Sequence, residues 1–287
     1  MRFSVIIPVY NRPEMVRRAI NSVISQTFSA SEIIVINDGS KDVTGEVVRK
    51  LSDTVEIPLH IIEHQKNRGV SAARNSGIKA AENEWIALLD SDDEWKPEKL
   101  ARQQEFHQQH PDLKISQCNE IWVRNGNRVK KRDIHRKIGG RIFKESLKLC
   151  LVSPSATVIH QSVFEDIGYF DESLPACEDY DFWLRALVKY PIGLLDEPLL
   201  IRYGGHSDQL SAKYWGMDRW RVKAMEKHLN ENLPQDWKIA LYEELIAKLE
   251  VLHQGAEKRD KPEAEVYQEK IRRYSEELYM LRSLSIL

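Results

Sequence analysis

The chain has 287 residues, 42% of them hydrophobic and 30% charged, which is typical of a soluble globular protein and too apolar for a disordered one. Its 42 basic and 44 acidic residues give a net charge of −2, so no global positive field favours a dedicated nucleic-acid binder. No apolar run approaches the roughly 18 residues of a membrane helix, and three distant cysteines support neither a disulfide framework nor a CxxC zinc site.

Strand and helix patterns alternate over the first hundred residues. Buried strands are predicted over four apolar runs, at 3–7, 33–36, 59–62 and 85–89, with Pro8 ending the first. Helices are predicted between them, one with Asn11 as its N-cap and Pro13 in its first turn, and two over 41–51 and 70–81. This alternation predicts an α/β fold with a doubly wound, mostly parallel central sheet, whose ligands bind beyond the carboxyl ends of the strands.

The rest of the chain is less regular. Helices are predicted over 97–109 and 178–189, and strands over 115–123 and 156–159. Between Arg124 and Arg141 the sequence has eight basic residues against one acidic residue, which is typical of a solvated loop and also suits an acidic or phosphorylated acceptor or a membrane surface. From Tyr214 onward the pattern is helical, with two amphipathic helices separated over 255–262.

Asp90 and Asp92 form the sharpest chemical feature of the sequence. They stand two residues apart, directly after the predicted strand at 85–89. Carboxylate oxygens in such a place make a hard site for Mg²⁺ or Mn²⁺, which leaves coordination positions open for a phosphorylated substrate. A turn that caps the next helix explains the same residues without a metal, so the pair alone is a weak signal.

Asp38 and Arg74 are expected in the same layer of the fold. Asp38 follows the second predicted strand, and a carboxylate only accepts hydrogen bonds, so it suits a base with an imino N–H such as uracil, thymine or guanine. Arg74 lies beside the small Ala72 and Ala73 on the predicted helix before the acidic pair, from which it can reach a phosphate or ribose. An Asx turn and a surface ion pair are the simpler interpretations of these two residues.

Four segments in order give the sequence a family resemblance. They are Val-Ile-Ile-Pro-Val-Tyr-Asn at 5–11, Val-Ile-Asn-Asp-Gly-Ser at 35–40, Asn-Arg-Gly-Val-Ser-Ala-Ala-Arg-Asn at 67–75 and Leu-Leu-Asp-Ser-Asp-Asp at 88–93. Together they resemble glycosyltransferase family 2, whose members are inverting, metal-dependent enzymes of the GT-A fold that use nucleotide-diphospho-sugars. The resemblance implies a GT-A domain over 1–212, with a nucleotide-binding half at 1–110 and an acceptor half at 111–212. The helical pattern of the remaining residues predicts a C-terminal extension over 213–287, to which the resemblance does not extend.

The resemblance also implies roles for particular residues. It implies a nucleotide pocket formed by Pro8, Tyr10, Asn11, Asp38, Arg74 and Asp90. Asp90 and Asp92 match the metal-nucleotide motif. His206 is expected as a further metal or diphosphate ligand, with an ordinary loop histidine as the other interpretation, because its surrounding residues match the family imperfectly. Asp179, which follows Glu178 in a later acidic motif, matches the catalytic base. Trp95 and Glu178 are expected to contact the acceptor, with a place in the core as the other interpretation of Trp95.

The resemblance implies a transferase that moves a sugar from a nucleotide-diphospho-sugar to an acceptor hydroxyl. A UDP-sugar is favoured, GDP- and dTDP-sugars also fit, and the acceptor is a glycan, a lipid-linked molecule or another hydroxyl compound. Bacterial surface polysaccharide or glycoconjugate synthesis is the family's commonest setting, which implies a cytoplasmic protein, at the inner face of the membrane if it makes a peripheral contact. The alternatives are a sugar nucleotidyltransferase, which needs a glycine-rich loop absent after the first strand, and an inactive nucleotide-sugar-binding module.

Overall fold

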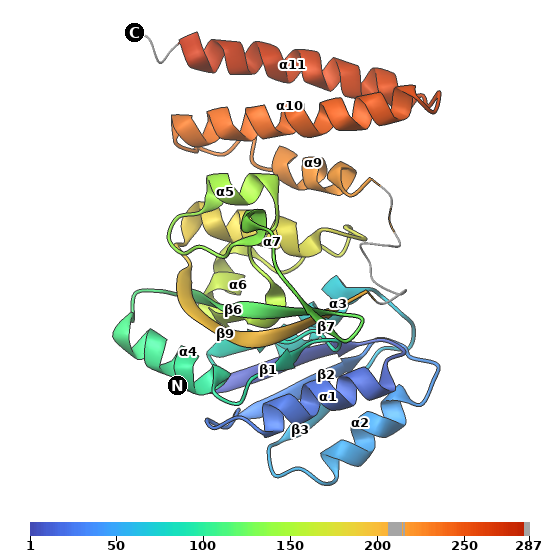
Figure 1. The fold of residues 1–287 in the computed structure, drawn as a ribbon, viewed down its shortest axis with the longest axis vertical. Helices are drawn as coiled ribbons and strands as arrows, with labels where there is room; N and C mark the ends of the chain where they lie inside the picture. The colour runs from blue at the N-terminus through green and yellow to red at the C-terminus, as the bar shows by residue number, and fades with distance from the viewer. Residues whose placement is uncertain (206–213, 215, 284–287) are drawn as a thin grey trace.

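One mixed β-sheet forms the centre of the protein. The computed structural model describes residues 1–205, 214 and 216–283. Within these residues the strands are β1 (Phe3–Val9), β2 (Glu32–Asn37), β3 (Leu59–Glu63), β4 (Trp85–Leu88), β5 (Glu94–Trp95), β6 (Ile115–Arg124), β7 (Asn127–Val129), β8 (Thr157–His160) and β9 (Gly193–Gly204). The described strands make a nine-stranded sheet in the order β3-β2-β1-β4-β8-β6-β9-β5, with β7 paired to β6 (Figure 1).

The first half of the sheet is parallel and covered on both faces. Strands β1 to β4 pair in parallel, and the helices α1 (Pro13–Ile24) and α2 (Thr44–Ser52) pack on one face while α3 (Val70–Ala80) packs on the other. Alternate residues of β1 therefore enter two separate cores, Val5 and Ile7 on the α1 side and Ile6 on the α3 side. Gly77 lets α3 approach closely, because a Cβ there would stand 2.5 Å from Ile6 Cγ2.

Two predictions, one about the end of the first strand and one about the start of the first helix, are wrong in detail. Pro8 does not end β1, which continues to Val9. Leu89 N–H donates to the C=O of Ile6, so the backbone polar groups of Ile6 point toward β4. The nitrogen of Pro8 points to the same side, but β4 has already ended there. The missing N–H of proline therefore costs the sheet no hydrogen bond. Asn11 is not the N-cap of α1, because Arg12 occupies that position and the helix starts at Pro13.

Beyond β4 the sheet becomes mixed and curls. β8 is antiparallel to β4 and β6, and β9 runs parallel to β6 with a register shift at Asn119. The two-residue strand β5 leaves the acidic segment after β4 and pairs with Leu200 and Ile201 of β9 at the far edge. Other helices described in this half are α4 (Lys99–Gln109), α5 (Phe143–Lys148), α6 (Gln161–Ile167) and α7 (Glu178–Lys189). The predicted α/β class is confirmed, with the doubly wound parallel order confined to the first half.

The C-terminal part is helical, as predicted, and stacks on α5 and α7 (Figure 1). Its described helices are α9 (Asp218–Glu226), α10 (Gln235–Glu257) and α11 (Glu263–Ser283). Leu241, Leu245 and Leu249 of α10 belong to the same buried core as Phe143 of α5. None of the described helices is both long enough and apolar enough to span a bilayer.

Candidate active site

Asp38 begins the loop that follows β2, at the edge where the parallel strands end. Its side chain is buried, and its carboxylate accepts hydrogen bonds from the backbone N–H groups of Arg68 at 2.9 Å and Gly69 at 2.8 Å. His64 Nδ1 lies 2.6 Å from Asp38 Oδ1. Asp38 therefore fixes the loop that leads into α3, and a nucleotide base that donates to this carboxylate must share it with those groups.

Gly39 allows that loop to lie against the end of β2. Its φ of +72° belongs to the left-handed region that glycine adopts without strain. A Cβ atom at this position would stand 2.5 Å from the backbone carbonyl carbon of Lys66. The turn after β2 thus brings two segments of backbone into direct contact beside Asp38.

Three predicted nucleotide-pocket residues lie at the same sheet edge. Pro8 is buried in β1, whereas Tyr10, just after this strand, is 41% exposed. Asn11 has a φ of +50°, and its side-chain oxygen accepts a hydrogen bond from the backbone N–H of Lys41. The bond ties the segment after β1 to the segment after β2, and it leaves the Tyr10 ring accessible between them.

Arg74 joins the acids of two distant segments. It is 3% exposed on α3; its Nη2 donates to Asp90 Oδ1 at 2.7 Å, and its Nη1 donates to Glu178 Oε1 at 2.8 Å. Asp90 follows β4, and Glu178 is the first residue of α7. The Phe170 ring lies 5.2 Å from the guanidinium carbon, within the range of a cation–π contact. One buried guanidinium thus connects the acidic motifs of the two halves of the chain.

Glu178 has a carboxyl group of altered acidity. Burial, and then the negative charge of Asp179, raise its pKa from 4.5 to about 7, and the ion pair with Arg74 offsets only part of that rise. Its side chain is buried against Arg74 and does not line the cleft described below, although the sequence predicts that Glu178 contacts the acceptor. Glu178 is therefore a group that takes up a proton close to neutral pH inside the protein.

Asp92 makes contacts with two arginines of the first helical segment. Arg12 Nη1 lies 3.1 Å from Asp92 Oδ2, and Arg18 Nη2 donates to the Asp92 carbonyl oxygen at 2.7 Å. Asp90 and Asp92 both present partly exposed carboxylates, the hard ligands that Mn²⁺ and Mg²⁺ prefer. No group of three or more metal-ligating side chains occurs within residues 1–205, 214 and 216–283. Each of the two carboxylates also pairs with an arginine, Asp90 with Arg74 and Asp92 with Arg12.

A cleft of about 790 Å³ opens on the second half of the sheet, between the β6–β7 hairpin, the end of β9 and the start of α7. Asp179, the predicted base, lines this cleft together with Cys150 and Tyr180. Most charged residues in its walls are basic, namely Arg124, Lys130, Arg132, Lys137, Arg202 and Arg221, against the acids Glu120 and Asp179. The predicted base thus faces a concave, mainly cationic space.

Asp179 has few contacts that would hold its carboxylate. Oδ1 accepts a hydrogen bond from the backbone N–H of Tyr180 at 2.7 Å, and the Cys150 thiol lies 3.7 Å from Oδ2. Burial, and then the charge of Asp179, raise the pKa of the Cys150 thiol well above its usual range, so it stays protonated. Its S–H also donates to the Val152 carbonyl oxygen at 3.2 Å, so it is at most a weak partner of Asp179. No ion pair involves this carboxylate in the described part of the chain. Asp179 is therefore able to accept a proton from a molecule in the cleft.

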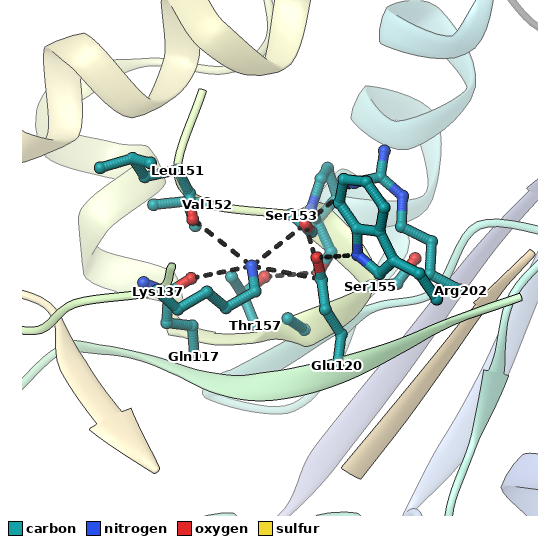
Figure 2. Close-up of polar contacts among 12 residues, drawn as sticks. Gln117, Glu120, Lys137, Leu151, Val152, Ser153, Ser155, Thr157 and Arg202 are labelled. Carbon is teal, nitrogen blue, oxygen red and sulfur yellow. Dashed lines mark hydrogen bonds and ion pairs between the residues drawn. The ribbon is translucent and has the colours of Figure 1, made fainter. Parts of the chain in front are cut away.

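A buried ion pair fixes the wall of the cleft opposite α7. Lys137 Nζ lies 3.3 Å from Glu120 Oε2 of β6 and 3.1 Å from Ser153 Oγ. Figure 2 shows these contacts as dashed lines. Ser153 Oγ in turn donates to Glu120 at 2.9 Å, and Arg202 Nη1 lies 3.4 Å from Ser153 Oγ. Burial raises the pKa of Glu120, but the cations led by Lys137 bring it down to about 2, so the pair is ionised. The basic segment after β7 is thereby attached to the sheet rather than solvated along its whole length.

Two of the predicted site residues need separate comment. Trp95 does not line the cleft, because it is 2% exposed in the core and its Nε1 donates to Ser155 C=O at 2.8 Å. The interpretation of Trp95 as an acceptor contact is therefore wrong, and the core interpretation is confirmed. His206 lies outside the described residues.

Other residues that line the cleft could not be identified from the sequence. Cys150, Ser153 and Arg202 come from segments that carry no recognisable motif and meet only through long-range pairing of β6 with β9. One feature of the sequence could have predicted the hairpin, because Asn-Gly is the strongest short-range marker of a tight hairpin turn. In the structure Asn125 and Gly126 both have the positive φ that such a turn requires. That pair divides the basic stretch into the β6–β7 hairpin and the segment that follows it.

Comparison with known sequences identifies relatives of this chain. The model of the family described as Glycosyl transferase family 2 matches residues 4–168. An uncharacterized glycosyltransferase of Rickettsia felis is 34% identical over 219 residues, which cover 73% of this chain and 35% of that protein. The uncharacterized glycosyltransferase YwdF of Bacillus subtilis is 32% identical over 198 residues, covering 67% of this chain and 70% of that protein. The chain thus spans about a third of the Rickettsia relative and most of the Bacillus one.

Solved structures share the fold of nearly the whole chain. TarS of S. aureus in complex with UDP-GlcNAc matches with a TM-score of 0.72 and 21% identity, covering 99% of this chain and 92% of that one. The mannosyltransferase PcManGT of Pyrobaculum calidifontis, in complex with GDP-Man and Mn²⁺, matches with a TM-score of 0.66 and 17% identity, covering 98% and 86%. The likeness extends over the C-terminal helices, and it places the chain among proteins of the GT-A fold.

Proposed function

This chain belongs to glycosyl transferase family 2, and on that premise we propose that it moves a sugar from a nucleotide-diphospho-sugar to an acceptor hydroxyl with inversion at the anomeric carbon. A UDP-sugar is the favoured donor, because structural neighbours hold UDP and UDP-GlcNAc and because Asp38 suits a base with an imino N–H. A GDP-sugar also fits, since PcManGT holds GDP-Man. The proposed acceptor is a glycan or lipid-linked molecule of surface polysaccharide or glycoconjugate synthesis.

The donor side of the proposed site lies at the edge where β1, β2 and β4 end. Tyr10 offers a ring for the base, and Asp38 and Arg74 hold the loop and helix that border the nucleotide. Asp90 and Asp92 would hold Mn²⁺ or Mg²⁺, which, when bound, supplies positive charge against the leaving nucleoside diphosphate. The proposed metal rests on the two carboxylates and on the Mn²⁺ of PcManGT.

The acceptor side is the cleft that Asp179 lines. There the Asp179 carboxylate accepts the proton of the acceptor hydroxyl as that oxygen attacks the anomeric carbon from the face opposite the nucleotide. The observation that carries this proposal is the double ion pair of Arg74, which connects Asp90 on the donor side to Glu178, the residue next to Asp179. The Arg74 side chain thereby sets the position of Asp90 relative to Asp179, the proposed base.

Binding of the nucleotide tests the donor site. Asp92→Ala is expected to lower Mn²⁺-dependent affinity for UDP or GDP by about tenfold or more, because it removes one of two carboxylates that hold the ion. Calorimetry with and without Mn²⁺ measures the effect, with Asp53→Ala, which removes an exposed carboxylate at the end of α2, as the matched control. Unchanged metal-dependent binding in Asp92→Ala would contradict the assignment, and a wild type that binds no nucleoside diphosphate would contradict the proposed function.

A further inference from the structure

The cleft beside Asp179 holds more positive charge than its acids neutralise. Of the six cationic residues in its walls, Lys137 is paired with Glu120, and Arg221 with Asp218 at 2.9 Å. Arg202 has no carboxylate within ion-pair distance but interacts with the charges of Asp93 and Glu120. In the described part of the chain, Arg124, Lys130 and Arg132 form no ion pair. Cations gathered in a concave space repel one another, and a bound anion relieves that repulsion.

The positive potential acts on neighbouring groups inside the cleft. Burial lowers the pKa of His135, and the charges of Arg132 and Arg202 lower it further. Burial likewise lowers the pKa of Lys131, with Lys137 and Arg202 adding to the decrease against the opposing charge of Glu120. Cations from β9 and from the segment after β7 therefore act together on the space between them.

The basic wall is fixed in place. The Lys137–Glu120 pair anchors the segment after β7 to the sheet (Figure 2). Trp122 Nε1 also donates to Glu120, at 2.6 Å. Lys130 and Arg132 precede this anchor by a few residues and line the cleft. Their charges are thus carried by a held segment and not by a long free loop, which reduces the entropy lost when a ligand binds.

We propose that the acceptor carries a phosphate or carboxylate group, which Lys130 and Arg132 hold in the cleft while the reacting hydroxyl faces Asp179. This inference rests on the proposed transfer function and adds the chemical class of its acceptor. The charges also orient the acceptor, because the Asp179 carboxylate repels an anion that the cationic wall attracts. An anionic acceptor therefore enters with its charged group toward the hairpin side and its hydroxyl toward the base.

Binding of three sugars that differ in charge tests the proposal. Glucose 6-phosphate, glucuronate and glucose are titrated into the full chain by calorimetry at low ionic strength, with and without the nucleoside diphosphate and Mn²⁺ that occupy the donor site. At least one of the two charged sugars is expected to bind about tenfold or more tightly than glucose, with an affinity that falls as salt is added. The measurement without nucleotide keeps this result separate from any failure of the donor site.

Two double variants with the same net charge locate the effect. Lys130→Gln/Arg132→Gln is expected to abolish the preference for the charged sugar. Arg128→Gln/Arg136→Gln removes two exposed cations of the same segment that do not line the cleft, and it is expected to keep that preference. Thermal melts of both variants show that each is folded.

Three results would overturn the proposal. In the first, the wild type binds glucose as tightly as the charged sugars, or binds neither charged sugar at millimolar concentration. In the second, both double variants lose the preference equally, which indicates a diffuse field and no site. In the third, only vesicles containing phosphatidylglycerol bind, and both variants lose that binding, which makes the hairpin a membrane contact.

Discussion

At the residue scale, the proposed chemistry depends on the ability of Asp179 to take a proton from the acceptor. General-base assistance by a side chain is typically worth about 10²–10⁴ in rate. Asp179→Asn keeps the shape of the side chain but cannot accept the proton, so we expect kcat to fall by about that factor. Steady-state kinetics of sugar transfer, with nucleotide affinity measured in parallel, checks the prediction.

Nucleotide affinity is expected to stay unchanged in Asp179→Asn, because the residue lines the acceptor cleft and not the edge formed by β1, β2 and β4. Asp166→Asn is a suitable control, since Asp166 is an exposed carboxylate of α6 paired with Lys189. Full transfer activity in Asp179→Asn would move the base to another acid, and loss of nucleotide binding would make Asp179 a structural residue.

Glu178 gives the stability of the protein a defined dependence on pH. Its pKa is raised from 4.5 to about 7, so between these values the folded state holds a proton that the unfolded state has released. The free energy of unfolding contributed by this group therefore falls as pH rises through that window. Denaturant unfolding at pH 5.5 and 8 is expected to show a smaller loss of stability in Glu178→Gln than in the wild type. An equal loss in both proteins would show that the carboxyl group titrates normally.

Some site residues could be identified from local sequence, and others could not. Asp90, Arg74 and Asp179 stand in short motifs with family spacing, and the ion pairs of Arg74 show why the motifs occur together. Lys137 could not be separated from the exposed cations around it, because its partner Glu120 lies on another strand. Burial of a charge depends on such long-range pairing, which no local pattern reports.

At the scale of elements, the turn after β2 sets the position of the loop that carries the donors to Asp38. Gly39→Ala is expected to destabilise the protein by more than Gly126→Ala, which costs about 1–2 kcal/mol through its positive φ alone. The two glycines have φ values of +72° and +78°, but only a Cβ at Gly39 would meet neighbouring backbone, whereas nothing lies within 4 Å of one at Gly126. Denaturant unfolding of both variants measures the difference. Equal destabilisation would show that the loop yields to the new methyl group.

The predictability of each strand follows from its burial. β1, β2 and β4 are covered on both faces, so each reads as a continuous apolar run. β9 contains Asp196, Glu197 and Pro198 near its register shift, and β5 has only two residues, so neither has a pattern of its own. Their pairing is set by tertiary packing, which overrides local propensity.

At the scale of the whole molecule, the C-terminal helices share a core with α5. The sequence predicts a GT-A domain over 1–212, and Leu241, Leu245 and Leu249 of α10 pack in the same core as Phe143. Each buried leucine contributes about 1.5–3 kcal/mol, so a chain ending at residue 212 is expected to be insoluble or to melt at a much lower temperature.

A chain ending at residue 260 lacks only α11 and is expected to stay folded, because few α11 side chains are buried, chiefly Tyr274 and Leu278. Thermal melts of the two truncated chains and of the full chain test this order. A chain ending at residue 212 that melts like the full protein would show that 213–287 is an independent unit.

The short pairing of β5 with β9 has a consequence for how two ligands affect each other's binding. β5 continues the segment of Asp90 and Asp92, and near the end of the same β9 lie Arg202 and Tyr203, which line the cleft of Asp179. Tyr203 N–H also donates to Asp93 at 3.3 Å. A ligand that moves the paired strands β5 and β9 when it binds at one site changes the free energy with which a second ligand binds at the other site. Thermodynamic linkage then requires reciprocity: the factor by which nucleotide alters acceptor affinity equals the factor by which acceptor alters nucleotide affinity.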